Sequence, residues 1–335
     1  MKIIRSMTGL RAVRKPLCLA AGFFDGVHTG HQAVLRRAAA AAAAMGGETW
    51  AMTFHTHPLK VLRPESAPPL LTSTAHKVAL MGRLGVDGCL LIPFTRRFAA
   101  LEPEDFLRRL EQDAPTLAHI FVGEDWRFGH FGRGDTAMLS AWAATRGIEL
   151  TQVPPVRCAG GTVSSTRIRE AIAAGRLDLA RRLLGRPFSI LGTVVRGNRI
   201  GREIGFPTAN LDPHNEVRPP VGIYAVQSLI AGKAYEGIVN FGVHPTVAQV
   251  PEPLLELHVL DASLQLYRRH IEVFFIARLR AERRFLTLDA LVRQIRLDLG
   301  AARRALRAPA AQKEWNKALQ VWYPDSIVPS KKQKK

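Results

Sequence analysis

Apolar runs and amphipathic runs alternate along the first half of the chain. Residues 17–21 and 88–93 are unbroken apolar stretches, which are typical of strands buried on both faces of a parallel sheet. The same reasoning predicts further strands at 49–54, 118–122 and 148–153, and helices at 32–45, 72–84, 103–110 and 136–147. This alternation predicts a doubly wound α/β domain with ligands at the carboxyl ends of its strands.

The pattern changes after residue 184. From 188 to 278 the predicted strands are short and punctuated by glycine and proline, which favours an antiparallel sandwich or barrel. Residues 288–299 carry apolar side chains at helical spacing behind the capping residue Thr287. We therefore expect domains at 1–184 and 185–310, followed at 311–335 by a basic, partly disordered tail.

The sequence GFFDGVHTGH at 22–31 joins a predicted strand to a predicted helix. The first amides of a helix lack partners within it and lie at its positive end, so such a junction can hold phosphate. His28 and His31 are three residues apart and can stabilise charge on a phosphate in transfer. The alternative is a surface histidine pair or a stray metal site. Neither the Walker nor the dinucleotide fingerprint is present.

Three further segments of the first half follow predicted strands. His57 and Pro58 end the strand at 49–54, where side chains often face the ligand cleft. The glycine-rich loop after residue 122 holds Trp126 and Phe128, which could cover a ring or, alternatively, plug the core. A second phosphate cradle is predicted at the start of a helix, formed by Ser164, Ser165, Thr166, Arg167 and Arg169.

The second half has its own candidate site. Glycines 197, 201 and 205 mark a loop that leads to Thr208 and Asn210, whose oxygens suit Mg²⁺ together with a phosphate. Alternation at 254–261 places Glu256 and His258 on one face and the leucines on the other. A carboxylate facing a cavity could act as general base on a substrate hydroxyl. The alternative is a solvent-facing glutamate.

Composition narrows the class of protein. The net charge of +19 over 335 residues suits polyanionic partners, either nucleic acid or nucleotide phosphates. A basic nucleic-acid-binding protein is therefore an alternative, but the arginines are dispersed and no zinc-finger or RRM signature appears. Three widely spaced cysteines and the lack of a long apolar run favour a reduced, cytoplasmic protein without membrane spans, with a homo-oligomer left open.

The motifs also occur in a characteristic order. GFFDGVHTGH, TFHTHP, GEDWRFG, VSSTRIREAI, GFPTANL, GIYAV, LELHVLD and RFLTLDALVRQIRLDL follow one another along residues 1–307. Together they resemble the bacterial bifunctional riboflavin kinase/FMN adenylyltransferases, also called FAD synthetases. The resemblance implies a Rossmann-like N-terminal nucleotidyltransferase domain and a C-terminal six-stranded antiparallel β-barrel kinase with a terminal helix.

The resemblance also implies the reactions and their residues. ATP and riboflavin would give FMN, and FMN and ATP would give FAD and pyrophosphate, with Mg²⁺ as the metal. Glu256, His28 and His31 would be catalytic, and Thr208 and Asn210 would hold the metal. The candidate ATP and phosphate-binding residues are Gly22, Phe24, Asp25, Gly26, His28, Gly30, His31, Ser164, Ser165, Thr166, Arg167, Arg169, Gly197, Gly201, Gly205, Thr208 and Asn210. The candidate flavin-binding residues are His57, Pro58, Asp125, Trp126, Phe128, Tyr224, Asn240 and Glu256.

Several positions depart from the family pattern. The second-strand motif is HTHP where an acidic residue usually precedes proline-histidine, and Glu124 and Trp126 replace the usual residues of the glycine-rich loop. In the kinase half, His244 stands where an arginine is usual and Arg268 where a glycine is usual. These two leave open an adenylyltransferase whose kinase-like barrel is weakened or inactive.

Overall fold

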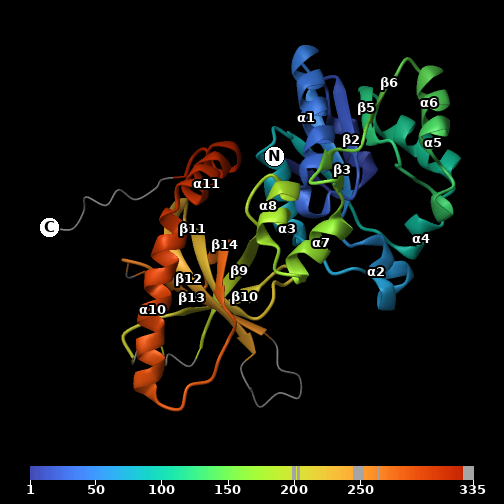
Figure 1. The fold of residues 1–335 in the computed structure, drawn as a ribbon. Coiled ribbons are helices and arrows are strands. Elements are labelled where there is room, and N and C mark those ends of the chain that lie inside the picture. Colours follow the sequence, from blue (N-terminus) through green and yellow to red (C-terminus); the bar gives the residue numbers. More distant parts are fainter. Residues whose placement is uncertain (198–200, 202–203, 244–252, 263, 327–335) are drawn as a thin grey trace. The chain divides into compact units, whose positions relative to one another are not determined.

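The computed structural model describes residues 1–197, 201, 204–243, 253–262 and 264–326, which form two compact units (Figure 1). The first unit comprises Met1–Leu70 and Thr74–Ser165. The second comprises Leu71–Ser73 and the described residues from Thr166 onward. His244 and the end of the basic tail lie outside the described residues.

A parallel sheet forms the centre of the first unit, in the order β1-β4-β3-β2-β5-β6. The strands are β1 (Lys2–Ile4), β2 (Leu17–Ala21), β3 (Glu48–Phe54), β4 (Gly88–Ile92), β5 (Leu117–Gly123) and β6 (Glu149–Val153). The chain leaves β2 toward β3 on one side and later returns to β5 on the other. Ligands bind in open α/β sheets at such a reversal. The predicted Rossmann-like sheet is confirmed, and the carboxyl ends of β2 and β5 are its expected site.

Helices connect these strands. They are α1 (Thr29–Ala44), α2 (Pro58–Leu62), α3 (Thr74–Gly82), α4 (Arg96–Ala99), α5 (Pro103–Asp113) and α6 (Thr136–Ala144), with the 3₁₀ turns η1 (Met7–Ala12), η2 (Asp25–Val27), η3 (Pro64–Ser66) and η4 (His130–Gly132). The alanine-rich helix α1 packs on β2, β3 and β5. It begins at Thr29, three residues before the predicted start, because the side chain of His28 caps it.

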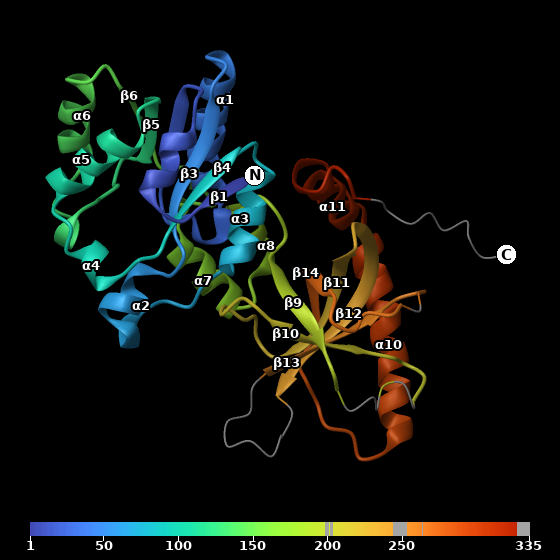
Figure 2. The same ribbon diagram turned by 180° about the vertical axis from the view of Figure 1, so that it is seen from behind.

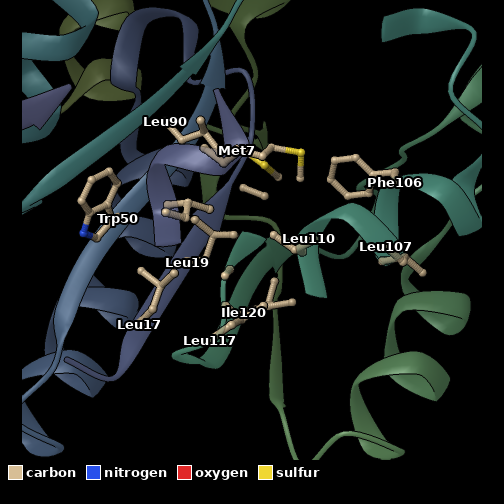
Figure 3. Close-up of a cluster of buried hydrophobic side chains, with 14 of the residues drawn as sticks. Met7, Leu17, Leu19, Trp50, Leu90, Phe106, Leu107, Leu110, Leu117 and Ile120 are labelled. Carbon is tan, nitrogen blue, oxygen red and sulfur yellow. The ribbon is translucent and has the colours of Figure 1, made fainter. Parts of the chain in front are cut away.

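The hydrophobic core of this unit lies on the face of the sheet covered by η1 and α5 (Figure 3). Leu17 and Leu19 of β2 are fully buried there together with Leu10 of η1 and Leu110 of α5. Residues two apart on a strand share a face, so Cys18 and the other alternate residues of β2 lie on the opposite side. The central strand β2 is thus buried on both faces, as its unbroken apolar run indicates.

The second unit contains a closed antiparallel barrel in the order β10-β13-β12-β11-β14-β9, closed by pairing of β9 with β10. Its strands are β9 (Ser189–Val195), β10 (Ala209–Pro213), β11 (Gly222–Ile230), β12 (Lys233–Val243), β13 (Pro253–Val259) and β14 (His270–Arg280). A short hairpin, β7 (Arg157–Cys158) and β8 (Gly161–Thr162), and helices α7 (Ser165–Ala173) and α8 (Leu177–Leu184) precede the barrel in the chain. The predicted six-stranded barrel is confirmed.

Two helices follow the barrel. Helix α10 (Leu288–Arg307) is longer than the predicted 288–299 and packs on β11, β12 and β14 (Figure 2). Residues 311–322, which we expected to belong to the basic tail, instead form most of α11 (Pro309–Trp322). The expectation fails there because Trp315 and Trp322 are buried. The Trp315 ring meets that of Phe274 in β14 at 5.0 Å, and the guanidinium of Arg186 lies 5.0 Å from the centre of the Trp322 ring.

Candidate active sites

The turn after β2 has an unusual backbone. Phe24, Gly26 and Val27 have φ values of 56°, 77° and 42°, in the left-handed region that side chains other than glycine rarely adopt. Phe24 and Asp25 are 1% exposed, so their side chains shape the turn from beneath. Backbone strain of this kind persists where the surroundings impose it, and it is concentrated at ligand sites.

The two histidines meet where this turn becomes α1. Nδ1 of His28 accepts a hydrogen bond from the backbone amide of His31 at 3.3 Å, and the two rings stack with centroids 3.5 Å apart. Gly30 lies beside this cap. A Cβ at Gly30 would come within 3.1 Å of the His28 ring, so a larger residue would crowd the cap. Nδ1 of His31 is buried and has no hydrogen-bond partner among the described residues. The arrangement leaves a polar ring atom available at the positive end of a helix.

Burial lowers the pKa of His31 well below its usual value, and the neighbouring His28 and Lys77 lower it further. His31 is therefore neutral at physiological pH. A neutral imidazole carries one donor and one acceptor nitrogen, so it can donate a hydrogen bond to a phosphate oxygen while the other nitrogen accepts one.

The second predicted cradle reaches the same turn through one residue. The hydroxyl of Ser165 donates a hydrogen bond to the carbonyl oxygen of Asp25 at 3.0 Å. Ser164 immediately precedes this helix start, while Thr166, Arg167 and Arg169 follow in the first turns of α7. The structure thus brings Ser165 to the histidine turn, and the phosphate contacts of the three later residues stay a prediction.

An aromatic cavity of about 700 Å³ opens beside this turn. Gly22 and Phe23 line it from the end of β2, Pro58 from α2, and Trp126 and Phe128 from the loop after β5. The Trp126 and Phe128 rings stack at 4.9 Å, and Phe128 is also part of the core. The alternative that these aromatic rings plug the core is confirmed for Phe128, and both rings also line the cavity; that they cover a ligand ring stays a prediction.

Two other predicted residues of the first unit lie outside that lining. His57 caps α2 by accepting a hydrogen bond from the amide of Leu59 at 3.1 Å, and its ring meets the Phe23 ring edge-on at 4.6 Å. Asp125 is exposed at the start of the loop after β5. His57 thus supports the cavity wall formed by Phe23, and any contact of Asp125 with a ligand stays a prediction.

In the barrel, Glu256 lies in register between two asparagines. It pairs with Asn210 on β10 and with Asn240 on β12, so the three side chains form one row across adjacent strands. The Oδ1 atoms of Asn210 and Asn240 are buried and lack hydrogen-bond partners among the described residues. An unsatisfied buried amide oxygen is costly, and two of them flanking a carboxylate indicate a polar ligand.

This row lines a cavity of about 570 Å³ between the barrel and α10. Ile223 and Ile238 form its apolar wall, and Leu291 and Ile295 of α10 close it. Leu255 and Leu257 are buried on the opposite face of β13, which confirms the predicted alternation around Glu256. Glu256 therefore faces the helix-covered cavity, and the alternative of a solvent-facing glutamate is wrong.

Thr208 and Asn210 also line a second cavity of about 530 Å³, together with Arg196, Gly197 and Tyr267. These two residues thus stand between two adjacent cavities, which suits transfer of a group from one ligand to another. The Thr208 hydroxyl, the partnerless Asn210 Oδ1 and the Glu256 carboxylate are hard oxygen donors and fit Mg²⁺.

The other predicted residues of the second unit differ in placement. Gly197 lies against Asn210, because a Cβ at Gly197 would overlap the Asn210 side-chain amide. Gly201 lines the 570 Å³ cavity, whereas Gly205 lines neither cavity. Tyr224 is fully buried on the opposite face of β11 from Ile223, and its hydroxyl donates to the carbonyl of Pro220. Strand alternation thus separates Tyr224 from the residues predicted to share its flavin site.

Arg268 has a φ of 62°, a left-handed conformation in which glycine is favoured. Its guanidinium lies 5.6 Å from the centre of the Tyr267 ring, but Arg268 lines neither barrel cavity. The left-handed backbone conformation of residue 268 thus explains why the family usually has a glycine at this position.

The motif reading missed three residues that help to form the sites. Arg280 of β14 donates to both carboxylate oxygens of Asp298 at 2.9 and 2.6 Å, which fastens α10 over the cavity. Lys77 is 3% exposed beneath the turn after β2. Of these, only Asp298 carried a sequence signal, because it lies within the helix predicted at 288–299 to pack on the barrel.

A parallel α/β unit with histidines at a helix start and a barrel with two cavities define a nucleotide-dependent transferase with two active sites. A family model described as FAD synthetase matches residues 11–167, and one described as riboflavin kinase matches residues 184–306. The chain belongs to the bifunctional riboflavin kinase/FMN adenylyltransferase family.

Individual relatives agree with this assignment. The bifunctional riboflavin kinase/FMN adenylyltransferase of Pseudomonas fluorescens is 38% identical over 93% of this chain and 100% of its own length. The Escherichia coli K12 protein of the same name is 39% identical over 90% of this chain and 97% of its own. A crystal structure named as a macrolide-efflux protein from Streptococcus pneumoniae has a TM-score of 0.78 at 30% identity, covering 90% of this chain and 99% of that one.

Among the residues that the structure describes, no helix has the length and apolar character needed to cross a membrane.

Proposed function

We propose that a domain at 1–184, which contains the first unit, adenylylates FMN, and that a domain at 185–310, which contains the barrel, phosphorylates riboflavin. The observation that carries the proposal for the barrel is the row of Asn210, Glu256 and Asn240. Its two partnerless amide oxygens flank a carboxylate in the 570 Å³ cavity. This favours an active kinase over the alternative of a barrel that has lost its chemistry.

In the kinase step, the terminal ribityl hydroxyl of riboflavin attacks the γ-phosphorus of ATP, and the bond to the ADP oxygen breaks. Glu256 accepts the hydroxyl proton, while Asn210 and Asn240 orient the polar chain. Thr208 and Asn210 would hold Mg²⁺, which neutralises phosphate charge when bound. The neighbouring cavity lined by Arg196 and Tyr267 takes the nucleotide.

In the adenylylation step, a phosphate oxygen of FMN attacks the α-phosphorus of ATP, and pyrophosphate leaves. His28, neutral His31 and the positive N-terminal end of α1 stabilise the charge that develops on the phosphate. The aromatic cavity takes the flavin ring against Trp126 and Phe128. Three arginines that line this cavity, Arg63, Arg96 and Arg127, give it a positive potential suited to an anionic flavin.

The decisive experiment incubates the purified chain with riboflavin, ATP and Mg²⁺ and separates the flavins over time. We expect FMN first and FAD afterwards. His28→Ala should lower the rate of FAD formation by about 10²–10³-fold and leave the rate of FMN formation unchanged. Glu256→Gln should abolish FMN formation from riboflavin and leave FAD formation from supplied FMN unchanged. Glu236→Gln on β12 is its matched control. Untouched riboflavin with active adenylylation would show that the barrel is not a kinase.

The cellular location and the oligomeric state of the chain are also proposals. The reduced cysteines and the small-molecule substrates support a cytoplasmic enzyme. A homo-oligomer stays a prediction, and light scattering on the purified chain measures it.

A further inference from the structure

A buried lysine holds together two strand ends at the adenylylation site. Lys77 of α3 donates from Nζ to the carbonyl oxygens of Phe23 at 3.0 Å and Phe54 at 2.9 Å, and to the Thr53 hydroxyl at 3.2 Å. The ammonium group also lies 4.3 Å from the centre of the Phe23 ring. All three of its acceptors are uncharged oxygens.

These acceptors come from two neighbouring strands. Phe23 follows β2 and begins the turn that leads to the histidines, whereas Thr53 and Phe54 end β3. The Thr53 hydroxyl also donates to the Phe23 carbonyl at 2.8 Å. Lysine, threonine and carbonyl thus form a closed set of hydrogen bonds that joins the two strand ends beneath the site.

The charged and titratable groups around Lys77 come from three elements, η2, β4 and α1. Burial lowers the Lys77 pKa to about 8, against the opposing influence of Asp25 in η2 and Cys89 in β4. Burial raises the pKa of the Cys89 thiol to about 11, so Cys89 is neutral. Lys77 in turn is one of the causes that lower the pKa of His31 in α1, after burial and His28.

We propose that Lys77 is a positioning residue for adenylyl transfer, which acts by tying the turn that carries His28 and His31 to the end of β3. This inference rests on the proposed adenylylation function. The ammonium group supplies three donors that fix the Phe23 carbonyl, and its charge disfavours a second positive charge on His31. Loss of the three donors displaces an imidazole at the reacting phosphate, and loss of the charge raises the pKa of His31.

The test compares Lys77→Met and Lys77→Arg with the wild type, and Lys15→Met, an exposed lysine of the same unit, is the matched control. We expect Lys77→Met to lower kcat for FAD formation by at least tenfold, toward the ~10²-fold loss caused by a misplaced reacting group. FMN formation by the same preparation should not change. In the wild type, FAD formation should decline as the pH rises above about 8 and Lys77 loses its proton. Lys77→Arg should recover part of kcat and lose this alkaline decline.

An NMR titration of the imidazole groups gives a readout that does not depend on activity. The His31 pKa should rise in Lys77→Met, even if the wild type proves to make no FAD, which separates this inference from the proposed function. An unchanged kcat and an unchanged His31 pKa in Lys77→Met would overturn the proposal. If Lys77→Met does not fold, an alkaline decline in Lys77→Arg identical to that of the wild type would overturn it instead.

Discussion

The imidazole of His28 stacks on that of His31 at 3.5 Å and accepts the His31 amide hydrogen on Nδ1. One histidine therefore both caps α1 and sets the position of the other. This cap fixes the tautomer of His28, because Nδ1 must be the unprotonated nitrogen, which leaves Nε2 as its donor.

The buried His31 should make the stability of the chain sensitive to acid. Its native pKa is well below the unfolded value of 6.5, so the unfolded state takes up a proton that the native state refuses. The free energy of unfolding should fall as the pH drops below about 6.5 and is fully retained above it. Urea unfolding at several pH values should show a smaller fall for His31→Gln than for the wild type. His55→Gln, an exposed histidine of the same unit, should keep the wild-type slope.

Replacement of Gly197 by alanine should damage the kinase alone. The added Cβ would overlap the Asn210 amide and push it out of the row beside Glu256. We expect the rate of FMN formation to drop by about 10²-fold, as for a misplaced reacting group. FAD formation from supplied FMN should be unchanged. Gly300→Ala is the control, since a Cβ at Gly300 would lie 3.6 Å from Nη1 of Arg304, an ordinary contact. Full kinase activity of Gly197→Ala would refute the placement of Asn210.

Arg268→Gly should stabilise the barrel without changing its activity. A left-handed conformation costs a residue other than glycine about 1–2 kcal/mol, and the extra freedom of glycine in the unfolded chain returns about half of that. The free energy of unfolding should therefore rise by about 0.5–1 kcal/mol. Arg269→Gly, where the backbone is not left-handed, should instead destabilise the protein. A large gain of kinase activity in Arg268→Gly would mean that Arg268 impairs catalysis after all.

Trp322 should be one of the costliest side chains to truncate in the second unit. It is fully buried, and the guanidinium of Arg186 lies 5.0 Å from the centre of its ring. Trp322→Ala should lower the free energy of unfolding by about 3–5 kcal/mol. The neighbouring Val321, which is 40% exposed, should tolerate alanine within about 0.5 kcal/mol. Similar effects of the two substitutions would contradict the packing of α11.

Local pattern predicted the elements whose signal lies within themselves. The buried strands of the parallel sheet were readable from their apolar runs, and the turn between β2 and α1 from its glycines and histidines. The strand β1 was not, because Lys2, Ile3 and Ile4 are exposed or half-exposed and form no buried run.

Other features depend on partners far away in the sequence. Alternation separated Glu256 from its leucine neighbours, but it could not show which face α10 would cover. The family resemblance placed Tyr224 with the flavin, but Tyr224 is fully buried and does not line the cavity that Ile223 and Glu256 line. Helix α11 looked like the start of a polar tail because its two tryptophans find their partners on β14 and at Arg186.

The riboflavin kinase family model ends at residue 306, inside α10, yet Phe274 of β14 is still covered by Trp315 and Tyr323. The catalytic module and the folding unit of this chain therefore have different ends. A chimera or truncation cut at the limit of the shared module would keep the active-site residues and lose part of the hydrophobic core. The stability of the barrel therefore depends on α11, a segment that lies outside the part of the chain matched by the family model.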